Sequence, residues 1–245
     1  MSEAIPTLTQ NTQKVRHPLH EVWTQAWPII ITMTSYTVMQ FVDKLMVGQV
    51  GPLELAAQGN GGIWAFTPLA FAMGALVVVN TWVSQHMGAG HPERVARYLW
   101  GALYLTVGIW FAVLLPWSLL LPWFFTNVVH STHSVEQLDS LIALEVGYGQ
   151  ILLWGGIFQL AGRGIHQFFF GIMRPKVVTV AVIIGNIVNV GMSYILIFGE
   201  AGLSLSFIEL PGVPGGTAMG VHGAAIGTVC GLCTEAVIPF IVFLG

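Results

Sequence analysis

Charged residues are scarce in this sequence. Of 245 residues, 8 are Lys or Arg and 11 are Asp or Glu, which makes 8% of the chain. Soluble domains carry roughly 25%. Hydrophobic residues make up 55% of the chain, or about 135 residues, close to the roughly 120 to 150 that six membrane spans of about 20 to 25 residues require. The composition excludes a water-soluble core and indicates an all-α, polytopic membrane protein.

Several functional signatures are also absent. The net charge is −3 and no basic tract occurs, so the sequence offers nothing to neutralise a phosphate backbone and we expect no nucleic-acid partner. It has no Gly-rich phosphate loop and no nucleophile elbow, and its eight His lack the spacing of metal ligands. We therefore expect no enzyme activity, no metal and no cofactor, and an ion gradient as the source of energy.

Cysteine is nearly absent too. Cys230 and Cys233 form one C-x-x-C, but they lie in a helical run rich in Gly, Ala and Val and not in a βαβ pattern. We interpret them as two small side chains on a buried helix. The alternative is a membrane redox enzyme that uses both thiols.

Long apolar runs are abundant. Runs of 18 or more residues predict six membrane-spanning helices, over residues 23–48, 53–84, 98–124, 138–170, 177–198 and 220–245. We expect two parts: a cytoplasmic segment over residues 1–20 and one six-helix lobe over residues 21–245. The first part lacks the short basic region, apolar region and cleavage site of a signal peptide. Because the sixth run reaches the last residue without a polar tail, we expect this lobe to be truncated there and to belong to a longer protein.

The cations lie on one side of the predicted membrane. With the N-terminus in the cytoplasm, six of them fall on the cytoplasmic side and none on the other, as the positive-inside rule requires. We expect a multi-pass plasma membrane protein, in the bacterial inner membrane, with a cytoplasmic N-terminus. The six cations are Lys14, Arg16, Arg94, Arg97, Arg174 and Lys176.

Asp43 is the first candidate functional residue. It precedes Gly48, near the predicted outer end of the first span, by five positions, hence by about 7 Å. A carboxyl group at such a depth is costly unless it has a function or a partner, and it could exchange a proton or bind a sodium ion. The alternative is an interfacial Asp paired with Lys44, although consecutive helix positions point about 100° apart. In the same span we expect Pro28 to produce a kink that serves either packing or a hinge.

Polar side chains form a stripe on the fifth span. Asn186, Asn189 and Ser193 are spaced by three and four residues, so they share one helix face. Facing Asp43, they would make a protonation-sensitive network. The alternative is that they only hold helices together.

The sixth span combines small and polar residues. Gly223, Gly227 and Gly231 recur at four-residue intervals and predict a close helix contact. Thr228 lies beside them and could join the polar network, while Glu235 is a weaker candidate for an intramembrane carboxylate.

Three further polar residues lie on the fourth span. We interpret Glu145, in its first turns, as a solvated interfacial acid. Arg163 and His166 lie one turn apart toward the cytoplasmic end, where we expect Arg163 to extend its head group to the membrane surface.

Five segments, in order and spacing, resemble the multidrug and toxic compound extrusion (MATE) family of secondary transporters. They are Trp27-Pro28 with residues 40–48 (QFVDKLMVG), residues 83–90 (VSQHMGAG), residues 170–175 (FGIMRP), residues 189–199, and residues 220–228 (GVHGAAIGT). The resemblance extends from about Glu21 to the end of the chain and is an analogy of sequence pattern.

This resemblance implies one lobe of a twelve-helix, V-shaped antiporter that exports small organic, often cationic compounds or drugs in exchange for protons or sodium. The chain would be the N-terminal lobe, and the missing C-terminal lobe and the bilayer would be its partners. The family's ion-coupling carboxylate corresponds to Asp43, its bend proline to Pro28, and its polar partners to Asn189 and Thr228. Ser193 stands where the family often has Asp or Asn, which favours protons over sodium, and Lys44 replaces a usually uncharged residue.

In this hypothesis, protonation of Asp43 reorganises its bonds to Asn189 and Thr228 and lets the first span bend at Pro28. The residues expected to line the substrate cavity are Gln40, Asn186 and Tyr194. Two alternatives remain open: a lipid-linked oligosaccharide flippase of the same superfamily, which would favour a more cationic cavity, and a non-functional or homodimeric half-transporter.

Overall fold

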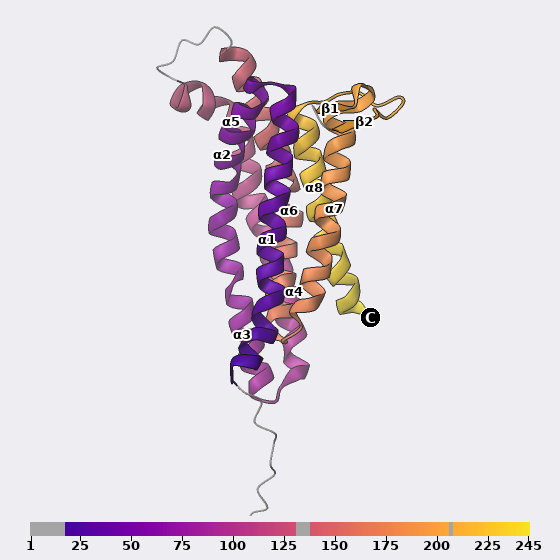
Figure 1. Ribbon diagram of the computed structural model, residues 1–245. Coiled ribbons are helices and arrows are strands. Elements are labelled where there is room, and N and C mark those ends of the chain that lie inside the picture. The colour runs from indigo at the N-terminus through magenta and orange to yellow at the C-terminus, as the bar shows by residue number, and fades with distance from the viewer. Residues whose placement is uncertain (1–17, 131–137, 206–207) are drawn as a thin grey trace, which may run out of the picture.

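Six helical rods make up most of the chain described by the computed structural model, which covers residues 18–130, 138–205 and 208–245. They run side by side along a common direction (Figure 1). The rods are α1 (Pro18–Val50); α2 (Pro52–Leu76) with α3 (Val78–Gly88); η1 (Pro92–Arg94), α4 (Val95–Ile109), η2 (Trp110–Leu114), α5 (Leu115–Phe124) and η3 (Phe125–Val129); α6 (Leu138–Gly171); α7 (Pro175–Phe198); and α8 (Val221–Leu244).

Proline and glycine mark the ends of the rods. Pro52, Pro92 and Pro175 each stand at the start of a helix, where the missing N–H leaves no intrahelical bond unmade. Gly199 ends α7 and Gly220 precedes α8, with φ of 55° and 54°; this left-handed region favours glycine.

A short hairpin joins α7 to α8. After η4 (Gly199–Ala201), β1 (Leu203–Leu205) pairs antiparallel with β2 (Ile208–Leu210). Sequence patterns predicted only a loop here. The end of the bundle with this hairpin is called the hairpin end below, and the end where α3 meets η1 and α6 meets α7 is the basic end; they are the top and bottom of Figure 1.

The predicted all-helical membrane architecture is confirmed, with the hairpin as its one addition among the described residues. Five rods, over residues 52–88, 92–129, 138–171, 175–201 and 221–244, are long and apolar enough to cross a membrane. The first rod, α1, has 33 residues and is long enough, but it is less apolar because it carries Asp43, Lys44 and several Ser and Thr. Asp43 and the hydroxyl groups of α1 form the contacts that are described below for the candidate site. The predicted segment 1–20 lies outside the described residues except for the first turn of α1.

The main core surrounds α6. Leu153 and Leu160 on α6 pack with Leu69 and Leu76 of the second rod and Leu99 of α4. A smaller cluster at the hairpin end joins α1, α6, α7 and α8 and includes Met46, Tyr148, Ile197 and Ala224.

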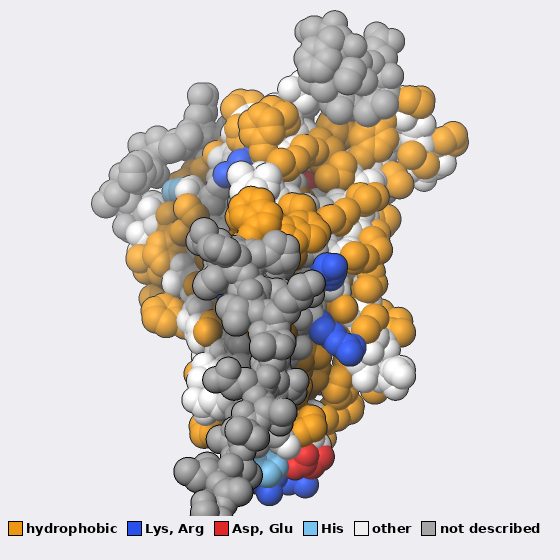
Figure 2. Space-filling model, turned by 60° about the horizontal axis from the view of Figure 1, so that its bottom comes forward, with side chains coloured by type: hydrophobic (Ala, Val, Ile, Leu, Met, Phe, Trp, Pro, Cys, Tyr) orange, Lys and Arg blue, Asp and Glu red, His pale blue; other side chains and the backbone are white. Residues whose placement is uncertain are grey.

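Large apolar side chains also cover the outside. Phe71, Tyr104 and Leu119 are 81%, 73% and 74% exposed, which suits contact with lipid. Figure 2 shows hydrophobic side chains along the sides and Lys or Arg at the end that comes forward. The exposed cations of the basic end are Arg94, Arg97, Arg174 and Lys176.

Candidate functional site

Close packing of α7 against α8 brings the predicted polar residues together. A Cβ added to Gly231 would come within 2.8 Å of the Asn189 Cβ, and one added to Gly227 would overlap Ser193. A third glycine, Gly223, lies against the backbone of α7 near Leu196. The predicted small-residue face of α8 therefore makes the contact from which Asn189 and Ser193 reach the first helix.

Asp43, Asn189 and Thr228 form one network across three helices. Asn189 Nδ2 donates to Asp43 Oδ2 at 3.4 Å and to Thr228 Oγ1 at 3.3 Å, and Thr228 donates to the Ala224 carbonyl at 3.0 Å. Asp43 is 5% exposed and Asn189 1%. The network links α1, α7 and α8 through a carboxyl group that is withdrawn from solvent.

Three oxygens of this site lack a hydrogen-bond partner within the described part of the chain. They are Asp43 Oδ1, Asn189 Oδ1 and Ser193 Oγ, all buried. Ser193 faces the Asp43 carboxyl group without forming a bond of good geometry. Unpaired buried oxygens are costly, and these three fit either a proton on the carboxyl group or an oxygen-coordinated cation.

Lys44 does not neutralise Asp43. It is exposed on the surface of α1, and among the described residues it forms no ion pair with its neighbour. The interpretation of Asp43 as an interfacial Asp held by Lys44 is therefore wrong for this structure.

Further polar contacts attach α1 to α7 and α8 toward the basic end. Thr32 and Thr179 both donate to the Pro28 carbonyl, at 2.8 and 3.2 Å, and Asn186 donates to Ser35 at 2.5 Å. Tyr36, one turn after Thr32 on α1, donates to Glu235 on α8. Pro28 lies within the continuous helix α1, buried, and its role as a hinge stays a prediction.

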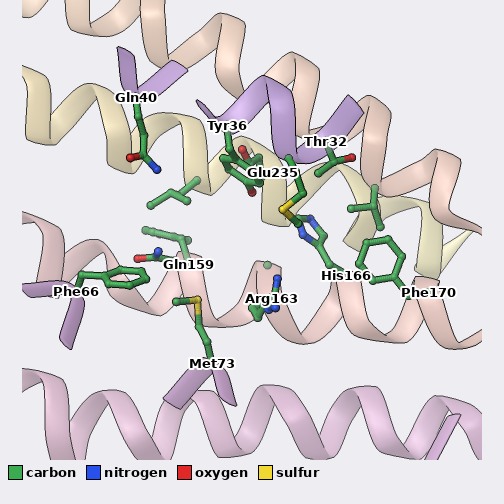
Figure 3. A pocket seen from close by; sticks show the side chains of 15 residues that line it. Thr32, Tyr36, Gln40, Phe66, Met73, Gln159, Arg163, His166, Phe170 and Glu235 are labelled. Carbon is green, nitrogen blue, oxygen red and sulfur yellow. The ribbon is translucent and has the colours of Figure 1, made fainter. Parts of the chain in front are cut away.

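A cavity of about 280 Å³ lies beside this row of contacts, among α1, α2, α6, α7 and α8. Figure 3 shows side chains of α1, α2, α6 and α8 around it. Its lining includes Gln40, Tyr36, Arg163, His166 and Glu235.

Of the three residues expected in the substrate cavity, only Gln40 lines this one. Asn186 is buried against Ser35, and Tyr194 donates to the Pro211 carbonyl at 2.7 Å, near the hairpin. Tyr194 lies at the hairpin end of α7, about five turns beyond Lys176 at the basic end.

The region that holds this site matches a known family. A family model named MatE matches residues 28–195, more than half of the chain, and this stretch includes Pro28, Asp43 and Asn189. The chain belongs to the MatE family.

Solved structures share the fold of this MatE family member. A MATE in complex with MaL6 has a TM-score of 0.71 at 21% identity, over 89% of this chain and 43% of that one. A MOP superfamily transporter from Pyrococcus furiosus Vc1 (DSM3638) gives 0.66 at 22%, over 89% and 43%. An outward-facing multidrug resistance MATE family transporter gives 0.64 at 22%, over the same shares. The MatE chain thus has the helical fold of about 43% of these longer proteins, and it is a multi-pass membrane protein.

Glu145 of the MatE chain is not a solvated acid, contrary to the sequence interpretation. It is 0% exposed; its Oε1 accepts from Asn60 and its Oε2 lies 2.8 Å from His130 Nε2. Because α6 begins at Leu138, Glu145 lies two turns inside the helix, where the second and third rods cover it.

Arg163 and Glu235 also differ from expectation. Arg163 was predicted to reach the membrane surface, yet it lines the cavity, because its face of α6 points into the bundle. Glu235, the weaker carboxylate candidate, is 3% exposed and bonded to Tyr36. The sequence shows a base and an acid on two different spans, but helices that are apolar on every side give no sign of which face points inward.

Cys230 and Cys233 are free, partly buried thiols on α8. Within the described residues, His, Cys, Asp and Glu side chains do not converge in groups of three or more that could hold a metal ion.

Proposed function

We propose that this chain is one lobe of a secondary active exporter of small organic, often cationic compounds, driven by exchange for protons or sodium. The observation that carries the proposal is the buried Asp43, bonded through Asn189 to Thr228. A buried carboxyl group changes the hydrogen bonds it can form whenever it gains or loses a cation. Because this one is bonded to α7 and, through Asn189, to α8, such a change would affect the contacts among three helices.

The proposed coupling step is supported by these contacts. With Asp43 ionised, Asn189 Nδ2 is drawn to it and shared with Thr228; with Asp43 neutralised, Asn189 is free to turn fully to Thr228 and α1 loses one attachment to α7. A bend of α1 at Pro28 would then change the cavity beside Tyr36. Export requires that drug and ion favour different states of the lobe, and α1 contacts both the carboxyl site and the cavity.

Protons are the favoured coupling ion. The site offers one carboxylate together with amide and hydroxyl oxygens, which is a low charge for retaining sodium against water. Sodium coordination by Asp43, Asn189 and Ser193 is the second possibility, and vesicles with an imposed pH or sodium gradient separate the two.

A second lobe of similar size completes the proposed transporter, since the solved structures that share this fold are more than twice as long as this chain. We propose a plasma membrane location, in the bacterial inner membrane, with the basic end in the cytoplasm. An exporter is favoured over an oligosaccharide flippase because the cavity balances Arg163 and His166 with Glu235, where a pyrophosphate would need a stronger excess of cations.

The test is Asp43→Asn in the full-length transporter, measured as gradient-driven export from vesicles. Export should fall to background while the amount of protein in the membrane is unchanged, because Asn keeps the shape but cannot exchange a cation. Asp139→Asn, an exposed acid at the start of α6, is the matched control and should export normally. Unimpaired export by Asp43→Asn would overturn the proposal.

A further inference from the structure

The cavity beside Tyr36 holds an acid and a base that do not pair with each other. Glu235 enters it from α8 and Arg163 from α6. No ion pair joins the two within the described residues, although Figure 3 shows both side chains turned toward the same space. The cavity thus has a negative pole and a positive pole.

The negative pole retains capacity to bind. Glu235 is 3% exposed, and its Oε2 accepts from Tyr36. Among the described residues, the carboxyl group of Glu235 accepts this one hydrogen bond, and its other oxygen, Oε1, accepts none. A buried carboxylate with one oxygen unoccupied is a site for an ammonium group.

The positive pole is unpaired as well. Arg163 Nε is buried and finds no acceptor in the described part of the chain, and the same holds for Nε2 of His166, which is 6% exposed. Both residues lie on α6, three positions apart, and line the same cavity. A guanidinium group binds a planar carboxylate with two parallel hydrogen bonds, and His166 can add a third contact.

The walls between the poles are apolar and partly aromatic. Phe66 of α2 and Phe158 and Phe170 of α6 line the cavity together with Met33 and Met73. Its volume of about 280 Å³ is just below the range of roughly 300 to 1,000 Å³ that is usual for drug-sized ligands, so a compact ring fits better than a long chain.

We propose that this cavity binds compact aromatic compounds that carry both an amine and a carboxylate, with the ammonium group at Glu235 and the carboxylate at Arg163 and His166. Leaving two opposite charges unpaired in a buried site is costly, and a ligand with both charges satisfies both poles. The role of such compounds as cargo rests on the proposed function, but their binding does not.

The experiment is titration calorimetry on the purified protein in detergent at pH 7, without any gradient. The probes are 4-(aminomethyl)benzoic acid, which carries both charges, its methyl ester, which keeps only the amine, and 4-methylbenzoic acid, which keeps only the carboxylate. The first should bind roughly tenfold to a hundredfold more tightly than either of the others, the range expected for one added charge-assisted contact.

Two variants assign the poles. Arg163→Gln should bind the amino acid and its ester equally, and Glu235→Gln should bind the amino acid and 4-methylbenzoic acid equally. Arg97→Gln, which removes an exposed cation of α4, should keep the full preference. Equal affinities of the three probes for the unmodified protein, or no binding of any, would overturn the assignment even if a variant fails to fold. Because no transport is measured, this result and the export result for Asp43→Asn stand or fall separately.

Discussion

The buried contact between His130 and Glu145 allows a quantitative prediction. The His130 side chain is 10% exposed and that of Glu145 0%, with 2.8 Å between Nε2 and Oε2. His130→Ala removes one of the two hydrogen-bond partners of the buried Glu145 carboxyl group and leaves Asn60 as the other. Removing one member of a buried pair costs about 3–5 kcal/mol, so we expect a loss of that size in the free energy of unfolding.

The cause of this loss can be isolated with a second substitution. Glu145→Gln replaces the carboxyl group but keeps an oxygen that accepts from Asn60, and should cost about 0.5–1.5 kcal/mol, the usual net contribution of one hydrogen bond. The double variant should then be more stable than His130→Ala alone, because an amide that lacks its His130 partner costs less to bury than a carboxyl group that lacks it. Unfolding of the purified protein by SDS in mixed micelles, followed by circular dichroism, measures all three.

The chain supplies its own control. His91 and Glu93 lie 3.3 Å apart with side chains 51% and 63% exposed, and such exposed pairs contribute little. His91→Ala should therefore leave the unfolding curve unchanged. The reasoning is refuted if His91→Ala is as harmful as His130→Ala, or if adding Glu145→Gln does not restore stability to His130→Ala.

Two further predictions concern α8. Gly231→Ala should lower the free energy of unfolding by about 1–3 kcal/mol through overpacking, because the new Cβ would come within 2.8 Å of the Asn189 Cβ. Gly74→Ala is the control and should not destabilise the protein, since no atom lies within 4 Å of its new Cβ. Equal thermal stability of the two variants would contradict the close α7–α8 contact. Replacing both Cys230 and Cys233 with Ala should leave gradient-driven export intact, and a complete loss of export from a folded variant would favour the redox alternative.

The helices were readable from the sequence because each apolar run is long and is ended by polar residues, Pro or Gly. The grouping of Asp43 with Asn189 and Thr228 was also accessible, since a carboxyl group at membrane depth needs partners and the stripe that includes Asn189 shares one helix face. The helix ends can be recognised within a single segment of sequence, and the need of Asp43 for polar partners follows from the cost of burying any carboxyl group in a membrane.

The errors have a common physical origin. A helix that is apolar on every side gives no sign of which face is inward, so Arg163 could not be assigned to a cavity, and Glu235 could not be placed opposite it. The burial of Glu145 depends on the second and third rods and on His130, which directly follows η3. His130 and Glu145 are 15 residues apart in the sequence, and only the fold brings their side chains together. The hairpin is too short for its pattern to stand out from a loop.

The manner in which α1 is attached limits how it can move. Hydrogen bonds join α1 to other helices at positions spread from Pro28 to Asp43, while Ile30, Phe41 and Leu45 on the same helix are exposed. Pulling α1 away into lipid would strip hydroxyl, amide and carboxyl groups of their partners where water cannot replace them. Small rotations or shifts that trade one acceptor for the next are far cheaper, so the first helix is built to change its bonding in place and not to detach.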